Sequence, residues 1–145
     1  MNTLSIATAC LLTPHCQLLL VRKRGSRFWM LPGGKIDGTE TAAQALQREL
    51  MEELQWDASA TFFHYLGAFE NRAANEANTR VQAQVFHVQL PQIPPVQIAA
   101  EIEAMQWWDL DTAMDDNFAP LVREMVVPAL RQALQHAQSP AGASI

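Results

Sequence analysis

The hydrophobic periodicity of the chain changes at Thr41, and this change constrains the fold more than any other feature. Before Thr41 the apolar residues form short runs, whereas after it leucines recur every four residues. These leucines are Leu46, Leu50 and Leu54. The spacing predicts a helix with one apolar face that begins at Thr41 and ends near Gln55. Thr41 and Gln44, three residues later, fit a capping box at its start.

Short apolar runs on both sides of this helix predict strands. The predicted strands cover residues 3–12, 17–22, 62–70, 81–90 and 104–109. The first two form a hairpin across residues 13–16, and residues 32–34 (PGG) form a further turn. Residues 118–137 predict a terminal helix in which Pro128 causes a kink or a break. This order of elements predicts an α/β or α+β sandwich with a mixed sheet.

Length, charge and cysteine content restrict the class of protein. The 145 residues fit one domain, expected over residues 1–138, with a disordered tail at 139–145. A net charge of −5 argues against a nucleic-acid polymer as partner. No basic residue precedes Arg22, and no apolar run approaches the ~20 residues of a membrane span, so neither a signal peptide nor a membrane partner is expected. Cys10 and Cys16 are expected to be free thiols, which favours a cytoplasmic protein.

Three glutamates occupy positions i, i+3 and i+4 of the predicted helix. Glu49, Glu52 and Glu53 therefore share one face, and the leucines on another face would direct all three carboxylates outward together. Mg²⁺ is typically held by one or two carboxylates plus substrate phosphates, so the cluster suits a magnesium–pyrophosphate site. Arg48 stands next to Glu49 and could orient the carboxylates. A solvated acidic helix face explains the spacing alone equally well.

The segment Gly34–Trp56, GKIDGTETAAQALQRELMEELQW, resembles the Nudix box, G-x5-E-x7-R-E-U-x-E-E-x-G-U, in which U is a bulky apolar residue. The fixed positions are matched by Gly34, Glu40, Arg48, Glu49, Glu52 and Glu53, and the apolar positions by Leu50 and Trp56. Gln55 replaces the last glycine of the motif. Because that glycine commonly takes a left-handed conformation after a helix, we expect Gln55 to change the end of the helix and the loop without loss of catalysis.

The resemblance implies a Nudix-type α/β/α sandwich around a mixed sheet. It also implies a hydrolase that uses Mg²⁺ or Mn²⁺ to cleave a pyrophosphate bond in a small nucleoside diphosphate-linked substrate. Glu49 and Glu53 would be the principal metal ligands, Glu52 a further or water-mediated ligand, and Arg48 would hold the glutamates in place. Glu40 and Gly34 would shape the loop before the helix.

Several substrate classes remain open within this family. A nucleoside triphosphate pyrophosphohydrolase of MutT type is the leading hypothesis. A hydrolase of nucleoside diphosphate sugars or dinucleoside polyphosphates is an alternative, as is a non-catalytic module that senses a nucleotide. A homodimer is also open, because family members are often dimers.

The remaining site predictions concern the general base and the substrate contacts. The base is either a box glutamate or a later acidic residue, and we prefer Glu101 to Glu103, although both could be plain loop carboxylates. The expected substrate contacts are Arg22, Arg24, Trp29, Gly33 and Gly34. The arginines would bind phosphates, Phe28 or Trp29 would stack on a base, and the glycines would let the backbone approach the ligand. A solvated basic loop and packing of the aromatic rings in the core are the alternatives.

Overall fold

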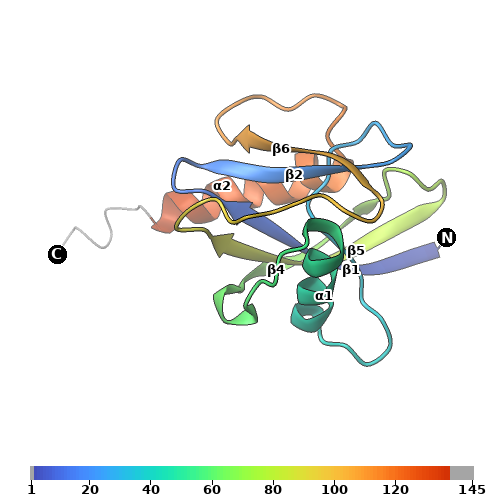
Figure 1. Ribbon diagram of the computed structural model, residues 1–145. Helices are drawn as coiled ribbons and strands as arrows, with labels where there is room; N and C mark the ends of the chain where they lie inside the picture. The colour runs from blue at the N-terminus through green and yellow to red at the C-terminus, as the bar shows by residue number, and fades with distance from the viewer. Residues whose placement is uncertain (1, 138–145) are drawn as a thin grey trace.

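The computed structural model describes residues 2–137, which form a mixed six-stranded sheet with a helix on each side (Figure 1). The strands are β1 (Asn2–Leu12), β2 (Gln17–Lys23), β3 (Gly33–Lys35), β4 (His64–Arg72), β5 (Thr79–Gln89) and β6 (Ile102–Asp109). The helical segments are α1 (Ala42–Leu54), the 3₁₀ turn η1 (Ala60–Phe62), the π-helical segment η2 (Leu121–Val126) and α2 (Val127–Ala137). The predicted α/β fold with a mixed sheet is confirmed.

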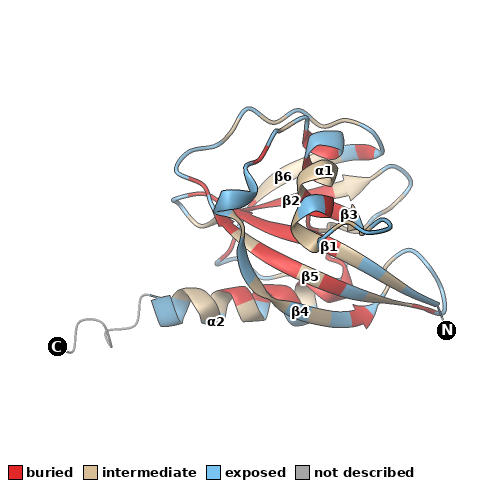
Figure 2. Cartoon of the chain, turned by 90° about the horizontal axis from the view of Figure 1, so that it is seen from below, coloured by how far each residue is buried: buried red, intermediate tan, exposed pale blue. Residues whose placement is uncertain are grey.

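Strand β1 lies in the middle of the sheet, whose order is β4-β5-β1-β2-β6 with β3 beside β1. It pairs in parallel with β5 along its length and antiparallel with β3. Because side chains alternate along a strand, Ala9 and Leu11 point to the side of α1, whereas Cys10 and Leu12 point to the side of α2. Buried segments therefore run along β1 and β5 (Figure 2).

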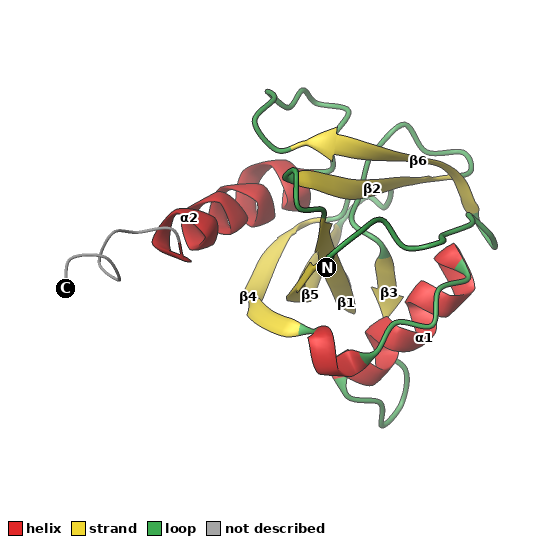
Figure 3. Ribbon diagram, turned by 60° about the vertical axis from the view of Figure 1, so that its left-hand side comes forward, coloured by secondary structure: helices red, strands yellow, loops and turns green. Residues whose placement is uncertain are grey.

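Helices α1 and α2 cover opposite faces of this sheet (Figure 3). The apolar face of α1 packs on residues of β1 and β2 such as Leu19. On the opposite face of the sheet, Leu130 of α2 packs in a separate cluster with Cys10 and Leu12 of β1. Cys10 and Cys16 are free thiols, as predicted. Among the described helices, none combines the length and the apolar character needed to cross a membrane. The single domain over residues 1–138 stays a prediction, and the predicted tail at 139–145 lies outside the described residues.

Helix α1 begins and ends where the sequence predicts. The N–H of Gln44 donates to Thr41 Oγ1 at 3.1 Å, and the N–H of Thr41 donates to Gln44 Oε1 at 2.9 Å, which completes the capping box. The three leucines of the apolar face are fully buried. The predicted change at the end of the helix is wrong, since Gln55 itself adopts the left-handed conformation (φ 51°, ψ 37°) that glycine favours there.

The predicted turn at residues 32–34 is also wrong, because Gly33–Lys35 forms strand β3 against β1. Gly33 has a φ of +141°, and a Cβ at this position would collide with the carbonyl oxygen of Ala7 and lie 2.7 Å from the Cα of Thr8. Only glycine lets the two backbones come this close. The glycine pair therefore marks a close strand contact, which hydrophobic periodicity does not reveal.

The other strand boundaries differ modestly from prediction. The predicted hairpin of the first two strands is confirmed only next to its turn, where Leu12 pairs with Leu18, and farther along β1 the partner is β3 at Ile6–Thr8. The strand predicted over residues 62–70 is β4, which begins at His64 and extends to Arg72, because residues 60–62 form η1. The loop between β4 and β5 covers residues 73–78.

The terminal helix changes from π-helical to α-helical hydrogen bonding next to Pro128, where the sequence predicts a kink or a break, and it runs on without a gap. Segment η2 is π-helical, and the N–H of Val127 donates to the carbonyl of Val122. Pro128 is the second residue of α2, and because it has no N–H it cannot donate to a carbonyl of η2 as Val127 does. The proline therefore fixes the place at which the π-helical segment gives way to α2.

Candidate active site

Glu53 is a buried carboxylate at the contact between α1 and β3. It is 2% exposed, and the N–H of Gly33 donates to its Oε1 at 3.0 Å. Burial raises the pKa of Glu53 to about 8, and the charge of Glu49 adds to this effect. The prediction that all three carboxylates point outward is therefore wrong for Glu53, because β3 covers this part of the helix.

Glu49 lies beside Gly34 on the same side of α1. Its side chain is 15% exposed, and burial raises the pKa of its carboxyl group although Arg48 acts in the opposite direction. A Cβ on Gly34 would lie 2.5–2.7 Å from the three carboxyl atoms of Glu49. Gly34 therefore provides the space in which this carboxylate is held. Glu52, by contrast, is 51% exposed and lies at the edge of the cluster.

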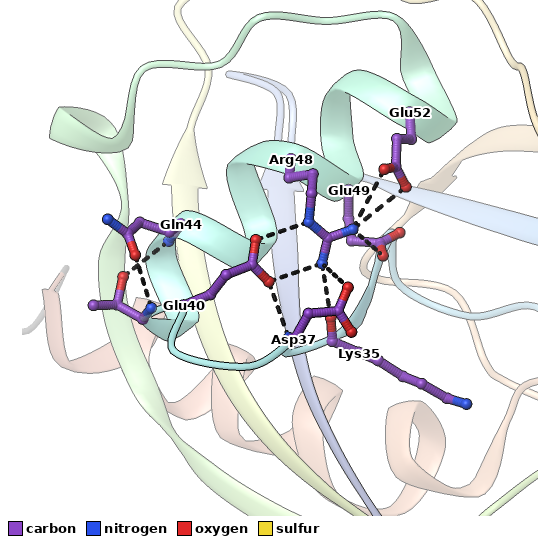
Figure 4. Close-up of polar contacts among 8 residues, drawn as sticks. Lys35, Asp37, Glu40, Gln44, Arg48, Glu49 and Glu52 are labelled. Carbon is purple, nitrogen blue, oxygen red and sulfur yellow. Dashed lines mark hydrogen bonds and ion pairs between the residues drawn. The ribbon is translucent and has the colours of Figure 1, made fainter.

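Arg48 connects the loop before α1 to the glutamates of the helix (Figure 4). Its partners are Glu40 at 2.8 Å, Glu49 at 3.0 Å, Asp37 at 3.3 Å, Glu52 at 3.4 Å and the carbonyl oxygen of Lys35 at 3.0 Å. The hydrogen bond from Arg48 lowers the pKa of Glu40 to about 2. Glu40 in turn accepts a hydrogen bond from the N–H of Asp37 at 2.9 Å, so one arginine fixes both loop and helix.

The donor set of this cluster fits a hard divalent cation. Glu49 and Glu53 are oxygen donors whose pKa values are raised because both are removed from water, and a cation between them would favour their charged forms. Within residues 2–137, no three acidic, histidine or cysteine side chains converge into a complete ligand set. Mg²⁺ requires no such set, since phosphate oxygens and waters normally complete its coordination.

Lys23 and Glu101 border the same cluster. Lys23 Nζ lies 3.3 Å from Glu101 Oε1, and the N–H of Arg24 donates to the Glu101 carbonyl at 2.8 Å. Both side chains are close enough to Glu53 for their charges to shift its pKa in opposite directions. Lys23 is not among the residues predicted from the sequence. Its position at the end of a predicted strand, in the basic loop before the glycine pair, was the sequence feature that could have indicated it.

Of the other residues predicted to contact substrate, the two glycines line a cavity, whereas the two arginines and the tryptophan do not. Gly33 and Gly34 line this cavity together with Lys23. The Arg22 guanidinium lies 5.1 Å from the centre of the Trp29 ring and pairs with Glu103 at 3.5 Å. Trp29 also packs against the core on the side of α2, which agrees with the alternative that its ring serves packing. The side chain of Arg24 is exposed, and none of these three lines the cavity.

One family model covers most of the chain. The sequence model of the NUDIX domain matches residues 2–127. The MutT protein from Methanosarcina mazei Go1 has a similar fold, with a TM-score of 0.73 at 20% identity over 91% of this chain and 96% of that one. An octanoyltransferase from Myxococcus xanthus is 35% identical over 79% of this chain and 32% of its own length. A putative 8-oxo-dGTP diphosphatase from Bacillus subtilis is 42% identical over 30% of this chain and 29% of its own. The matched part of this chain thus spans about a third of each of these two curated relatives.

Proposed function

This chain belongs to the Nudix family, and from that premise we propose that it is a MutT-like pyrophosphohydrolase that acts on a nucleoside triphosphate. The observation that carries the proposal is the pair of carboxylates, Glu49 and Glu53, held against the backbone of Gly33 and Gly34. Such a pair, next to backbone that a ligand can approach, suits a cation bound to a pyrophosphate. The Bacillus subtilis relative supports the triphosphate class.

In the proposed hydrolysis, the glutamates of α1 bind the metal, and Arg48 and Gly33 position them. Glu49 and Glu53 hold the divalent cation, Mg²⁺ or Mn²⁺, and Glu52 is a further or water-mediated ligand. A cation held there would supply neutralisation of phosphate charge and a lower pKa for an attacking water. Arg48 holds Glu49 through one ion pair and Gly33 holds Glu53 through one hydrogen bond, so the ligands are fixed before substrate arrives. Glu53 would give up its proton in order to hold the cation.

Two other substrate classes remain compatible with this site. A nucleoside diphosphate sugar or a dinucleoside polyphosphate presents the same pyrophosphate to the same carboxylates. A nucleotide-sensing module without activity ranks lower, because all three box glutamates are present. A homodimer and the expected lack of nucleic-acid polymers as partners stay predictions.

The first test is release of phosphate and pyrophosphate from a panel of triphosphates, diphosphate sugars and dinucleoside polyphosphates. We expect turnover of one class that needs Mg²⁺ or Mn²⁺ and stops with chelator. Glu49→Gln should lower kcat by roughly a hundredfold or more, because charge stabilisation of this kind has that size. Glu70→Gln is the matched control. Glu70 is an exposed carboxylate on β4 that pairs with Arg80 on β5, and its substitution should leave turnover unchanged. Nucleotide binding without turnover would favour the sensing module instead.

We propose Glu101 as the general base, since it borders the cluster and contacts Lys23. Glu101→Gln should lower kcat by about a hundredfold or more, the size expected for loss of a general base, while the affinity for the nucleotide product stays similar. Glu103→Gln, two residues away and paired with Arg22, is the comparison and should have little effect. A kcat within threefold of wild type for Glu101→Gln would identify Glu101 as a plain loop carboxylate.

A further inference from the structure

A cavity of about 160 Å³ lies beside β3, on the face of β1 that α2 covers. Its walls are mainly aliphatic and come from β1, β5 and η2, with Ile6, Val81, Leu121 and Val122 among them. Gly33 and Gly34 line it as well, and Gly33 donates to Glu53 while Gly34 lies beside Glu49. Gly33, whose N–H holds Glu53, and Lys23, whose charge acts on Glu53, thus belong both to the cavity and to the proposed pyrophosphate site. The apolar walls suit the uncharged part of a ligand.

One polar side chain in these walls has no partner in the folded protein. Thr8 is 4% exposed, and its Oγ1 makes no hydrogen bond with any residue in the described part of the chain. Along β1 it follows the alternation of Ile6 and Cys10, so its side chain points to the face on which the cavity lies. A buried hydroxyl without a partner destabilises a protein, and valine would fill the same space without this penalty.

The position of Thr8 relates this hydroxyl to the carboxylates. Thr8 pairs with Gly33 across β1 and β3, and the N–H of Gly33 holds Glu53. A substrate whose phosphates bind at Glu49 and Glu53 would extend past the glycine pair into the cavity. The first part of it to pass Thr8 would be the nucleoside attached to those phosphates.

We propose that the Thr8 hydroxyl is a specificity-determining group that hydrogen-bonds the nucleoside of the substrate in this cavity. The inference rests on the proposed function and adds a residue outside the Nudix box to the substrate site. A threonine hydroxyl both donates and accepts, so it can pair with a sugar hydroxyl or with the edge of a base. The aliphatic walls pack against the flat faces of the base.

The test is calorimetric binding of nucleoside monophosphates to the full chain in chelator, which removes any contribution from the metal. Thr8→Val should weaken binding about tenfold, the size of one lost hydrogen bond in a buried site. Thr8→Ser, which keeps the hydroxyl, should bind within about threefold of wild type. Ribose 5-phosphate separates the two partners, because its binding weakens in Thr8→Val if the hydroxyl contacts the sugar and is unchanged if it contacts the base.

The melting temperature of each variant distinguishes a ligand contact from a structural one. Thr8→Val should melt at the same temperature as wild type or higher, because it removes an unpartnered buried hydroxyl. A lower melting temperature for Thr8→Val would assign the hydroxyl to the fold and overturn the inference. Equal monophosphate binding by Thr8→Val and wild type would also overturn it and leave the proposed function intact. Failure of the proposed function would appear separately, as absence of metal-dependent turnover in the substrate panel.

Discussion

Glu53→Gln should strongly lower turnover and, at neutral pH, raise the free energy of unfolding of the metal-free protein. Turnover should fall by roughly a hundredfold or more, because the substitution removes a charge that the cation requires. The stability gain follows from burial, which makes the charged carboxylate unfavourable and raises the pKa of Glu53 to about 8. Glutamine stays neutral and can still accept the hydrogen bond from Gly33.

The gain depends on pH in a defined direction. The pKa of Glu53 is about 8 in the folded protein against 4.5 for an ordinary glutamate, so between these values the folded state binds one more proton than the unfolded state. The contribution of this proton is fully present below pH 4.5, decreases as the pH rises and is lost above about 8. Between low pH and pH 7, the wild-type protein should lose on the order of 3 kcal/mol of unfolding free energy through Glu53.

Denaturant unfolding in chelator at pH 5 and pH 8, with turnover measured in Mg²⁺, tests this prediction. Wild type should lose stability between the two pH values relative to Glu53→Gln, whereas Glu70→Gln should follow wild type because Glu70 is exposed. A less stable Glu53→Gln at pH 8 would contradict the assignment of Glu53 as a buried carboxylate held for function. Retained turnover would contradict its role as a metal ligand.

Gly33→Ala should destabilise the protein by about 3–5 kcal/mol, through backbone strain together with overpacking against β1. The new Cβ would collide with the Ala7 carbonyl and lie 2.7 Å from the Cα of Thr8, and the φ of +141° is unfavourable for alanine. Separation of β3 from β1 would also move the N–H that holds Glu53, so activity should decrease with stability.

Gly25→Ala is the matched control for this substitution. Gly25 also has a positive φ, +83°, but a Cβ there meets nothing within 4 Å. Its cost should be limited to backbone strain, about 1 kcal/mol. Equal losses for the two variants in denaturant unfolding would show that the conformation of the glycine, and not the close approach of β3 to β1, accounts for the effect.

Local patterns in the sequence were sufficient to predict helix α1 and the register of its charges. The leucine spacing depends only on the helical repeat, and the capping box only on residues three apart, so both are visible in a short window. The same window places Arg48, Glu49, Glu52 and Glu53 in fixed positions along one helix. The resemblance to the Nudix box rests on these features, because the motif lies within one continuous segment of the chain.

Other features depend on segments that are distant in the sequence. The burial of Glu53, the strand at Gly33 and the cavity beside Thr8 all follow from the pairing of β1 with β3 and from the position of η2. A glycine pair has no periodicity to show which backbone it approaches, and helix spacing does not reveal what covers a given face. The sequence alone therefore determined which carboxylates stand together, whereas tertiary packing decided which of them is removed from water, because burial depends on distant neighbours.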